Sequence, residues 1–146
     1  MKIYLVIFAL FLFVLTSCSD EDNPASSSNT NTLTWNVSEW GTTNGITDSI
    51  KVNVTFNEKD GALNGSGTFA YGSSTFTYTE FNFNFTGNKT EEKLTLSAQE
   101  NGTNNSLQYT GLKTESWMGG NLVYLGDAVL RVNGNAYSIK ELEFPY

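Results

Sequence analysis

Residues 50–71 read IKVNVTFNEKDGALNGSGTFAY, and this stretch decides the fold class. Its first seven residues alternate between apolar and polar, which is the period of a β-strand with one buried face. Asp60-Gly61 follows, a pair that favours the positive φ angles of a tight hairpin turn. A second run, Leu63–Tyr71, carries Gly65 and Gly67 on one face, where the missing side chains permit strong coiling or close packing of a neighbour. The stretch therefore predicts an antiparallel β-hairpin.

The same alternation recurs along the rest of the chain, and no apolar stripe with the period of a helix persists beyond two turns. Short turns join the runs and leave no room for crossover helices. Consecutive strands should therefore pair in an antiparallel meander. We expect about eight strands, at residues 33–37, 50–56, 63–71, 75–86, 94–96, 107–112, 122–132 and 137–144.

An all-β domain of this kind can close into an up-and-down barrel, which removes the exposed strand edges. A two-sheet β-sandwich is the alternative.

Asn133-Gly134 is the strongest hairpin signal in the chain. The alternation changes phase near Thr79-Glu80, which predicts a β-bulge or a bend, and again near Lys140-Glu141, which predicts a second bulge.

Composition excludes several classes of function. The chain has 146 residues, enough for one domain, and a formal net charge of −7. The surplus of acid argues against a nucleic-acid partner, because Lys and Arg are what bind phosphate. The chain has no histidine and one cysteine, so a transition-metal site lacks ligands and a nucleophile lacks its commonest base. We therefore expect a protein that is not an enzyme and holds no cofactor or metal.

Paired carboxylates are the remaining route to catalysis, as in glycoside hydrolysis. Glu80 and Asp127 stand out because each lies within an otherwise apolar run, although a bulge at Glu80 and an interrupted strand at Asp127 are the simpler interpretations. The other acidic candidates are Glu39, Asp48, Glu141 and Glu143. An enzyme of this class would need two of these side chains buried and close together.

The N-terminus has the pattern of a secretory signal peptide. Lys2 precedes an unbroken run of thirteen apolar residues, Ile3–Leu15, which is shorter than the about 20 residues that span a bilayer. A buried helix is the alternative, but no later segment offers a helical face to cover it. Leu15-Thr16-Ser17-Cys18 resembles the lipobox of bacterial lipoproteins. The resemblance implies that Cys18 is acylated and becomes the first mature residue, with two or three acyl chains that hold it stably in a membrane.

Ser19-Asp20-Glu21-Asp22 resembles the surface-export signal of lipoproteins from Bacteroidetes-type bacteria. The resemblance implies a lipid-anchored protein of the outer membrane, displayed on the cell surface; the periplasmic face is the alternative. We expect residues 1–17 to be the signal peptide, residues 18–32 to be the lipidated cysteine and a flexible tether, and residues 33–146 to form a single all-β domain.

Behind the lipobox, the aromatic- and glycine-rich strands resemble the lipocalin-like and streptavidin-like small barrels of such lipoproteins. In a barrel of this kind, inward aromatic residues can line a cavity for a small lipophilic ligand. A core filled with side chains is the alternative. The candidates for lining a cavity are Phe76, Tyr78, Phe83 and Tyr109, with Phe56, Phe69, Tyr71, Phe81 and Phe85 in the same ladder.

Trp40 and Trp117 form a second candidate binding site. Each lies beside glycine in what the sequence indicates to be a loop, and exposed aromatic rings at loop tips suit sugar faces or protein partners. A tryptophan folded back over a barrel end is the alternative.

Asp48-Ser49-Ile50 resembles the three-residue O-glycosylation motif of exported Bacteroidetes proteins, which implies modification at Ser49.

These observations predict a lipid-anchored, non-enzymatic surface protein. It would bind a small lipophilic molecule in the barrel, or a glycan or protein at the loop end. The alternative is a structural or accessory envelope lipoprotein with a filled core that acts through a protein partner.

Overall fold

A computed structural model describes residues 30–43, 46–116 and 119–146. The described chain forms one sheet of eight antiparallel strands, in which sequence neighbours are also neighbours in the sheet. The predicted all-β meander is confirmed, and the sheet is single rather than a two-sheet sandwich. The strands are β1 (Asn31–Thr43), β2 (Ile46–Lys59), β3 (Ala62–Gly72), β4 (Thr79–Lys89), β5 (Lys93–Glu100), β6 (Ser106–Glu115), β7 (Leu122–Val132) and β8 (Asn135–Pro145).

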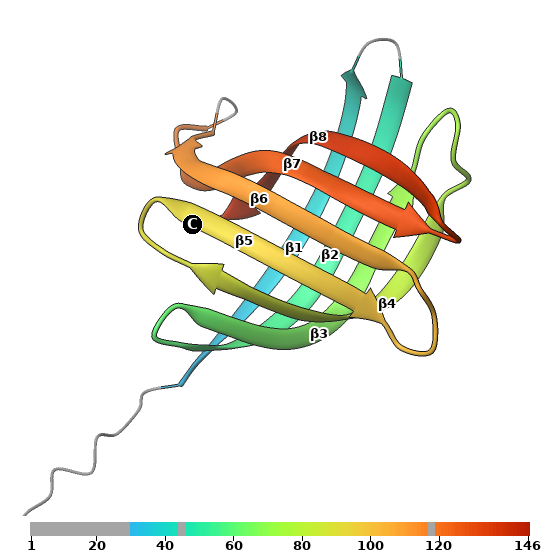
Figure 1. The fold of residues 1–146 in the computed structure, drawn as a ribbon. Coiled ribbons are helices and arrows are strands. Elements are labelled where there is room, and N and C mark those ends of the chain that lie inside the picture. Colours follow the sequence, from blue (N-terminus) through green and yellow to red (C-terminus); the bar gives the residue numbers. More distant parts are fainter. Residues whose placement is uncertain (1–29, 44–45, 117–118) are drawn as a thin grey trace, which may run out of the picture.

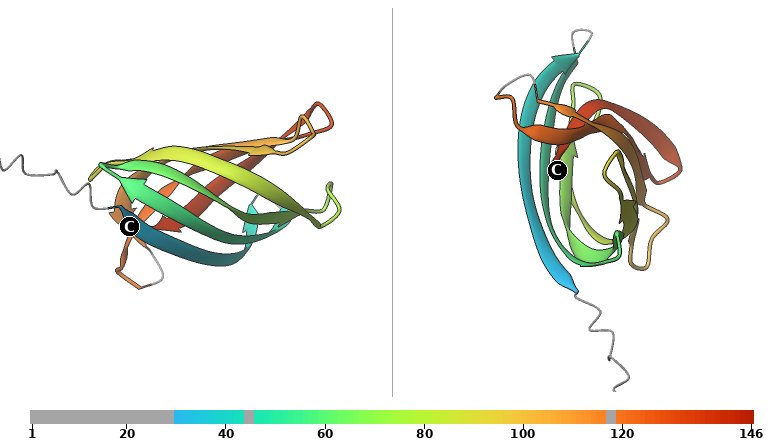
Figure 2. Two further views of the ribbon diagram at one scale, coloured as in Figure 1. Left: turned by 90° about the horizontal axis from the view of Figure 1, so that it is seen from below. Right: turned by 90° about the vertical axis from the view of Figure 1, so that its left-hand side faces the viewer.

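The sheet curls strongly into an open half-barrel (Figure 1, Figure 2). β1 and β8 are its two edges, and no backbone ladder joins them within the described residues. Trp35 of β1 nevertheless contacts Phe144 of β8, with ring centroids 5.5 Å apart. The edges therefore meet through side chains, whereas a closed barrel would join them by backbone hydrogen bonds.

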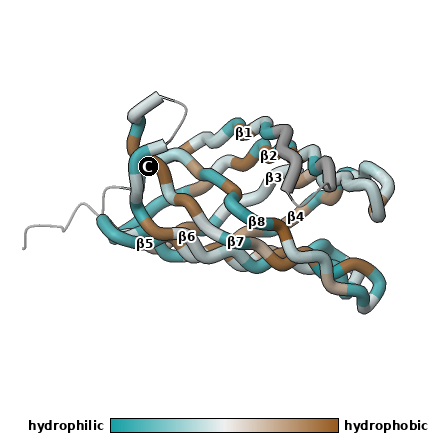
Figure 3. Tube along the Cα trace, turned by 90° about the horizontal axis from the view of Figure 1, so that it is seen from above, coloured by the Kyte–Doolittle hydropathy of each residue, from teal (hydrophilic) through white to brown (hydrophobic). Residues whose placement is uncertain are grey.

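Inward-facing side chains fill the concave side of the sheet. Along β4 every second residue is buried, at Phe81, Phe83 and Phe85. The rings of Phe83 and Phe85 meet edge to face with centroids 5.9 Å apart, and Phe85 lies equally close to Phe56 of β2 at 5.9 Å. Figure 3 shows hydrophobic and hydrophilic residues alternating along the strands, as one buried face requires.

β3 carries glycines where its neighbours carry aromatic rings. Gly65 pairs with Phe56 of β2 and with Phe85 of β4, and Gly67 pairs with Phe83 of β4. A Cβ atom at either glycine would collide with the backbone of β2. The missing side chains therefore let β2 and β4 curl toward each other over β3, as the sequence predicts.

Two hairpins have the two-residue turns that the sequence predicts. The φ angles are 51° and 82° at Asp60 and Gly61, and 50° and 84° at Asn133 and Gly134. Positive φ at both central positions matches the right-handed twist of the strands that the turn connects.

The bulge predicted near Lys140-Glu141 is confirmed. The β7–β8 register shifts between Gly126 and Ala128, so that two residues of β8 lie opposite one residue of β7. Glu141 has a φ of 57°, in the left-handed region that a bulge uses.

Of the bulge or bend predicted near Thr79-Glu80, the bulge is wrong, because β3 and β4 pair there without a register shift; the chain bends earlier, at residues 74–76. β4 begins at Thr79, so Phe76 and Tyr78 belong to the loop of residues 73–78 and not to a strand. The change of phase marks the boundary between loop and strand. Alternating aromatic residues within a loop imitate the pattern of a strand.

The meander gives the half-barrel two distinct ends. The N-terminal end holds Asn31, the Asp60-Gly61 turn and Tyr146, and the distal end holds the loop of residues 73–78 and the Asn133-Gly134 turn. Figure 1 shows the loop of residues 73–78 far from the start of β1. A binding site at the distal end would therefore face away from anything that holds the N-terminus.

Phe83→Ala should lower the free energy of unfolding by about 3–5 kcal/mol, because this fully packed ring leaves a cavity among its neighbours. Urea unfolding followed by tryptophan fluorescence measures the change. Leu112→Ala is the control, since its side chain is 61 % exposed and its loss should change stability by less than about 0.5 kcal/mol. A loss below about 1 kcal/mol for Phe83→Ala would contradict a packed interior at this position.

Candidate functional site

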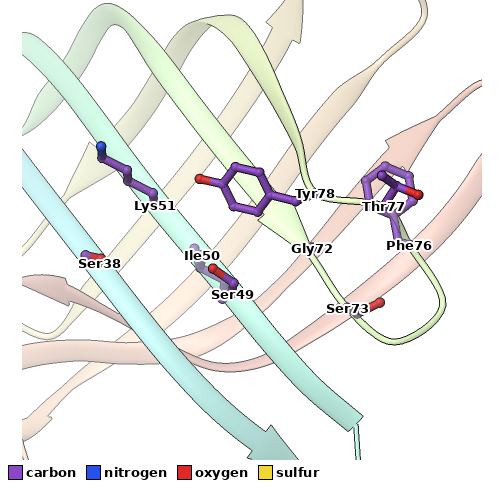
Figure 4. Close-up of a pocket in the computed structure, with 9 residues that line it drawn as sticks. All are labelled: Ser38, Ser49, Ile50, Lys51, Gly72, Ser73, Phe76, Thr77 and Tyr78. Atoms are coloured by element: carbon purple, nitrogen blue, oxygen red, sulfur yellow. The ribbon is translucent and has the colours of Figure 1, made fainter.

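A surface groove of about 530 Å³ lies at the distal end, on the side of β1, β2 and β3 (Figure 4). Its volume is within the range of small-molecule sites, about 300–1,000 Å³. We call it the distal groove. It is lined by Ser38 of β1, Ser49, Ile50 and Lys51 of β2, Gly72 of β3, and Ser73, Phe76, Thr77 and Tyr78 of the loop.

Register places three outward positions side by side across this groove. Ser38 pairs with Lys51, and Lys51 pairs with Ala70 of β3, so all three point to the same face of the sheet. Ala70 is only 1 % exposed although it is on the outer face. Figure 4 shows the ring of Tyr78 reaching from the loop across β3 toward Lys51. The tyrosine therefore forms part of the floor of the groove.

Gly72 permits this position of Tyr78. A Cβ atom at residue 72 would lie 2.9 Å from both the Cα and the Cβ of Tyr78, closer than atoms can pack. The side chain of Tyr78 still remains 51 % exposed. The site thus presents an aromatic ring that is held against the strand and open to a ligand.

Hydrogen bonds fix the loop that carries the two aromatic residues. The Ser73 N–H donates to the carbonyl of Phe76 at 2.8 Å, and the Phe76 N–H donates to the carbonyl of Ser73 at 3.3 Å. Phe76 turns toward the core, where its ring centroid lies 4.6 Å from that of Tyr137 and 5.8 Å from that of Tyr71. The loop therefore uses Phe76 to cover the distal end of the core and leaves Tyr78 at the surface.

Lys51 is the cation of the groove. Its side chain is exposed. The ion pairs in the described part of the chain join Lys113 to Glu91 and Lys140 to Asp127, so they leave Lys51 without a carboxylate partner there. Its ammonium group is therefore available to a ligand in the groove.

A second polar cluster lies at the open seam between β1 and β8. The backbone N–H of Glu143 donates to Oε1 of Glu39 at 3.3 Å, and the Ser116 hydroxyl donates to Oε2 of Glu143 at 2.9 Å. Burial, together with the charge of Glu143, raises the pKa of Glu39 to about 7 against the opposing effect of the backbone hydrogen bond. Of the acidic candidates, these are the two that the structure brings together.

The remaining acidic candidates lie apart from this pair. Glu80 is exposed at the start of β4. Asp127 accepts a hydrogen bond from Lys140, and this bond lowers the pKa of Asp127. Asp48 accepts one from the Tyr71 hydroxyl at 3.3 Å. Glu141 is exposed at the bulge of β8.

The structure separates the four candidates for lining an internal cavity. Tyr78 and Phe76 belong to the distal loop. Phe83 is 1 % exposed and stacks on Phe81, with ring centroids 5.6 Å apart. Tyr109 is 2 % exposed, and its hydroxyl donates to the carbonyl of Tyr124 at 2.6 Å. Burial raises the pKa of Tyr109.

Of the two tryptophans predicted to form a loop site, the structure describes the position of one. Trp40 lies within β1, where its backbone pairs with Ser49, and not in the predicted loop. Trp117 lies outside the described residues. Glu39 and Ser116, which precede the two tryptophans in sequence, both contact Glu143.

The predicted lipidation site, Cys18, and the export signal Ser19-Asp20-Glu21-Asp22 lie outside the described residues. Ser49, the predicted glycosylation site, is half-buried in β2 and lines the distal groove. Ser38, Lys51 and Gly72 were not among the predicted site residues. A lysine on the polar side of the predicted strand 50–56, which has no other charged residue, is the one signal that could have indicated Lys51.

Within the described residues, no helix has the length and apolar character needed to cross a bilayer. In the same residues, no three acidic, histidine or cysteine side chains come together as a possible metal site. Comparison with protein-family models, with curated proteins and with solved structures found no match to this chain.

The raised pKa of Glu39 predicts how stability depends on pH. The unfolded chain loses this proton near the ordinary value of 4.5, whereas the folded chain keeps it to about pH 7. Between these values the folded state binds more protons, so stability falls as pH rises, and the loss is complete above about pH 7. We expect a higher melting temperature at pH 5 than at pH 8, measured by differential scanning fluorimetry.

Glu39→Gln should flatten this pH dependence and raise the melting temperature at pH 8, because the variant has no charge to bury. Glu80→Gln, a change at an exposed carboxylate, is the matched control and should keep the wild-type dependence. An unchanged profile in Glu39→Gln would show that Glu39 does not carry the effect.

Proposed function

We propose that this chain is a lipid-anchored, non-enzymatic protein of the bacterial outer membrane that binds a glycan in the distal groove at the cell surface. The observation that carries the proposal is the exposed ring of Tyr78, which is held in place beside the hydroxyls of Ser38 and Ser49 and the ammonium of Lys51. A fixed aromatic face combined with a few polar groups is the usual composition of a site for a small polar ligand.

The polar groups of the groove suit a sugar better than a lipophile. An aromatic face provides apolar contact for the C–H side of a pyranose ring, and hydroxyl and ammonium groups exchange hydrogen bonds with its hydroxyls. The candidates inside the half-barrel, Phe83 and Tyr109, contact other buried side chains. This packing supports a ligand at the outer surface over one in the interior.

The placement of the groove supports display from a lipid anchor. Acylation of Cys18, as the lipobox implies, would tie the N-terminal side of the chain to the membrane. The groove is lined in part by the loop of residues 73–78, and this loop lies far from the start of β1 (Figure 1). A molecule anchored in this way would present the groove to the cell exterior. Protease treatment of intact cells distinguishes the outer face from the periplasmic face.

A structural or accessory role through a protein partner is the second candidate. The packed aromatic interior favours it, because a filled core needs no cargo. This function would be supported by a wild-type chain that binds no saccharide and that forms in-cell crosslinks from a photoreactive residue at position 78 to one envelope protein.

Tyr78→Ala should weaken glycan binding by about tenfold or more, since it removes the aromatic platform. Binding is measured on a glycan array and then by calorimetry, with the full chain in detergent micelles. Leu112→Ala is the matched control, because it removes a large exposed side chain from β6. Equal loss of binding in both variants, or an unchanged affinity in Tyr78→Ala, would contradict binding through the groove.

A further inference from the structure

We propose that the ligand of the distal groove is an acidic saccharide with isolated carboxylates, such as a uronic-acid oligomer. Its carboxylate would pair with Lys51 while a sugar ring stacks on Tyr78. This inference rests on the proposed function and adds the chemical class of the ligand.

The first argument for an acidic ligand is the positive charge of Lys51. The chain is strongly acidic, with a net charge of −7, and its surface as a whole repels anions. Lys51 is exposed in the groove and has no carboxylate partner among the described residues. Lys51 is the cation among the residues that line the groove, so it favours a ligand with a negative charge at that one point.

Glu80 limits how much negative charge a ligand of the groove can bring. Glu80 pairs with Ala70, so it faces the same side of the sheet as Lys51, with β3 between them. Asp48 directly precedes Ser49 in β2, but it has the phase of the buried Ile50 and is engaged by the Tyr71 hydroxyl, so it faces the other side of the sheet. A densely sulfated chain would meet the like charge of Glu80, whereas a saccharide with one carboxylate per sugar can place it at Lys51 alone.

The backbone at Lys51 offers no open edge for recognition of a peptide by strand addition. β2 is hydrogen-bonded to β1 on one side and to β3 on the other, and β3 is bonded to β2 and β4. No strand edge is open at Lys51, so an extended peptide finds no backbone partners. The groups that remain are the hydroxyls of Ser38 and Ser49, the ammonium of Lys51 and the ring of Tyr78. These groups match the hydroxyls, carboxylate and ring faces of an acidic sugar.

The experiment compares acidic saccharides with their neutral counterparts. Oligogalacturonate, oligomannuronate and oligoglucuronate are titrated into the full chain in detergent micelles, each beside its methyl ester. The ester keeps the sugar ring and removes the charge. We expect at least one acid to bind about three- to tenfold more tightly than its ester, as for an exposed ion pair, and we expect salt to reduce this preference.

The variants separate the two contacts. Lys51→Gln should remove the preference for the acid, so that the acid and its ester bind this variant equally. Tyr78→Ala should weaken binding of acid and ester alike. Lys59→Gln is the matched control, since it removes an exposed lysine of the same strand at the N-terminal end, and it should behave as wild type. Circular dichroism establishes that each variant is folded.

Equal binding of acids and esters by the wild-type chain would overturn the acidic ligand and leave glycan binding in place. A preference for the acid that survives in Lys51→Gln would overturn the role of this lysine. If no saccharide binds, acidic or neutral, the proposed function itself fails. Tighter binding of sulfated than of carboxylated saccharides would contradict the limit that Glu80 sets on ligand charge.

Discussion

Contact between aromatic rings across a glycine-bearing strand is the constraint on which the structure depends. Phe56 and Phe85 lie on β2 and β4, with β3 between them. In a flat sheet these alternate strands would be about 9.6 Å apart, but the two ring centroids are 5.9 Å apart. The rings meet over Gly65, where a Cβ atom would collide with the backbone of β2, and the bend of the sheet brings them closer. Burial of these rings therefore drives the curl that turns a meander into a half-barrel.

Because the curl fills the concave side, the features available for recognition lie on the convex side and in the loops. The distal loop shows how one segment serves both surfaces. Phe76 packs inward against Tyr71 and Tyr137, while Tyr78 lies outward along the strand at Gly72. The inward ring ties the loop to the core, so the outward ring is held in place before any ligand arrives. Pre-organisation of this kind lowers the entropic cost of binding.

Much of the fold could be predicted from the sequence, because local signals carry it. Alternation identifies the strands, and the Asp60-Gly61 and Asn133-Gly134 pairs identify two turns whose φ angles have the expected sign. The site could be predicted far less well. The distal groove depends on the register of three strands, which places Ser38, Lys51 and Ala70 side by side, and single-strand patterns contain no register. The sequence pattern places Tyr78 in a strand for a related reason, since two aromatic residues at alternate positions look the same in a loop as in a strand.

The seam between β1 and β8 could be predicted least of all, since its partners Glu39 and Glu143 are 104 residues apart in sequence. It also explains why the sheet stays open. Closure would align the backbone of β1 with that of β8 and use the N–H of Glu143 in a ladder. That N–H instead donates to the side chain of Glu39. A side-chain acceptor satisfies the donor without fixing a strand register. Two acidic side chains at the seam also oppose closer approach when both are ionised. The rings at the middle of the sheet thus set its curvature, and the acids at its edges limit its closure.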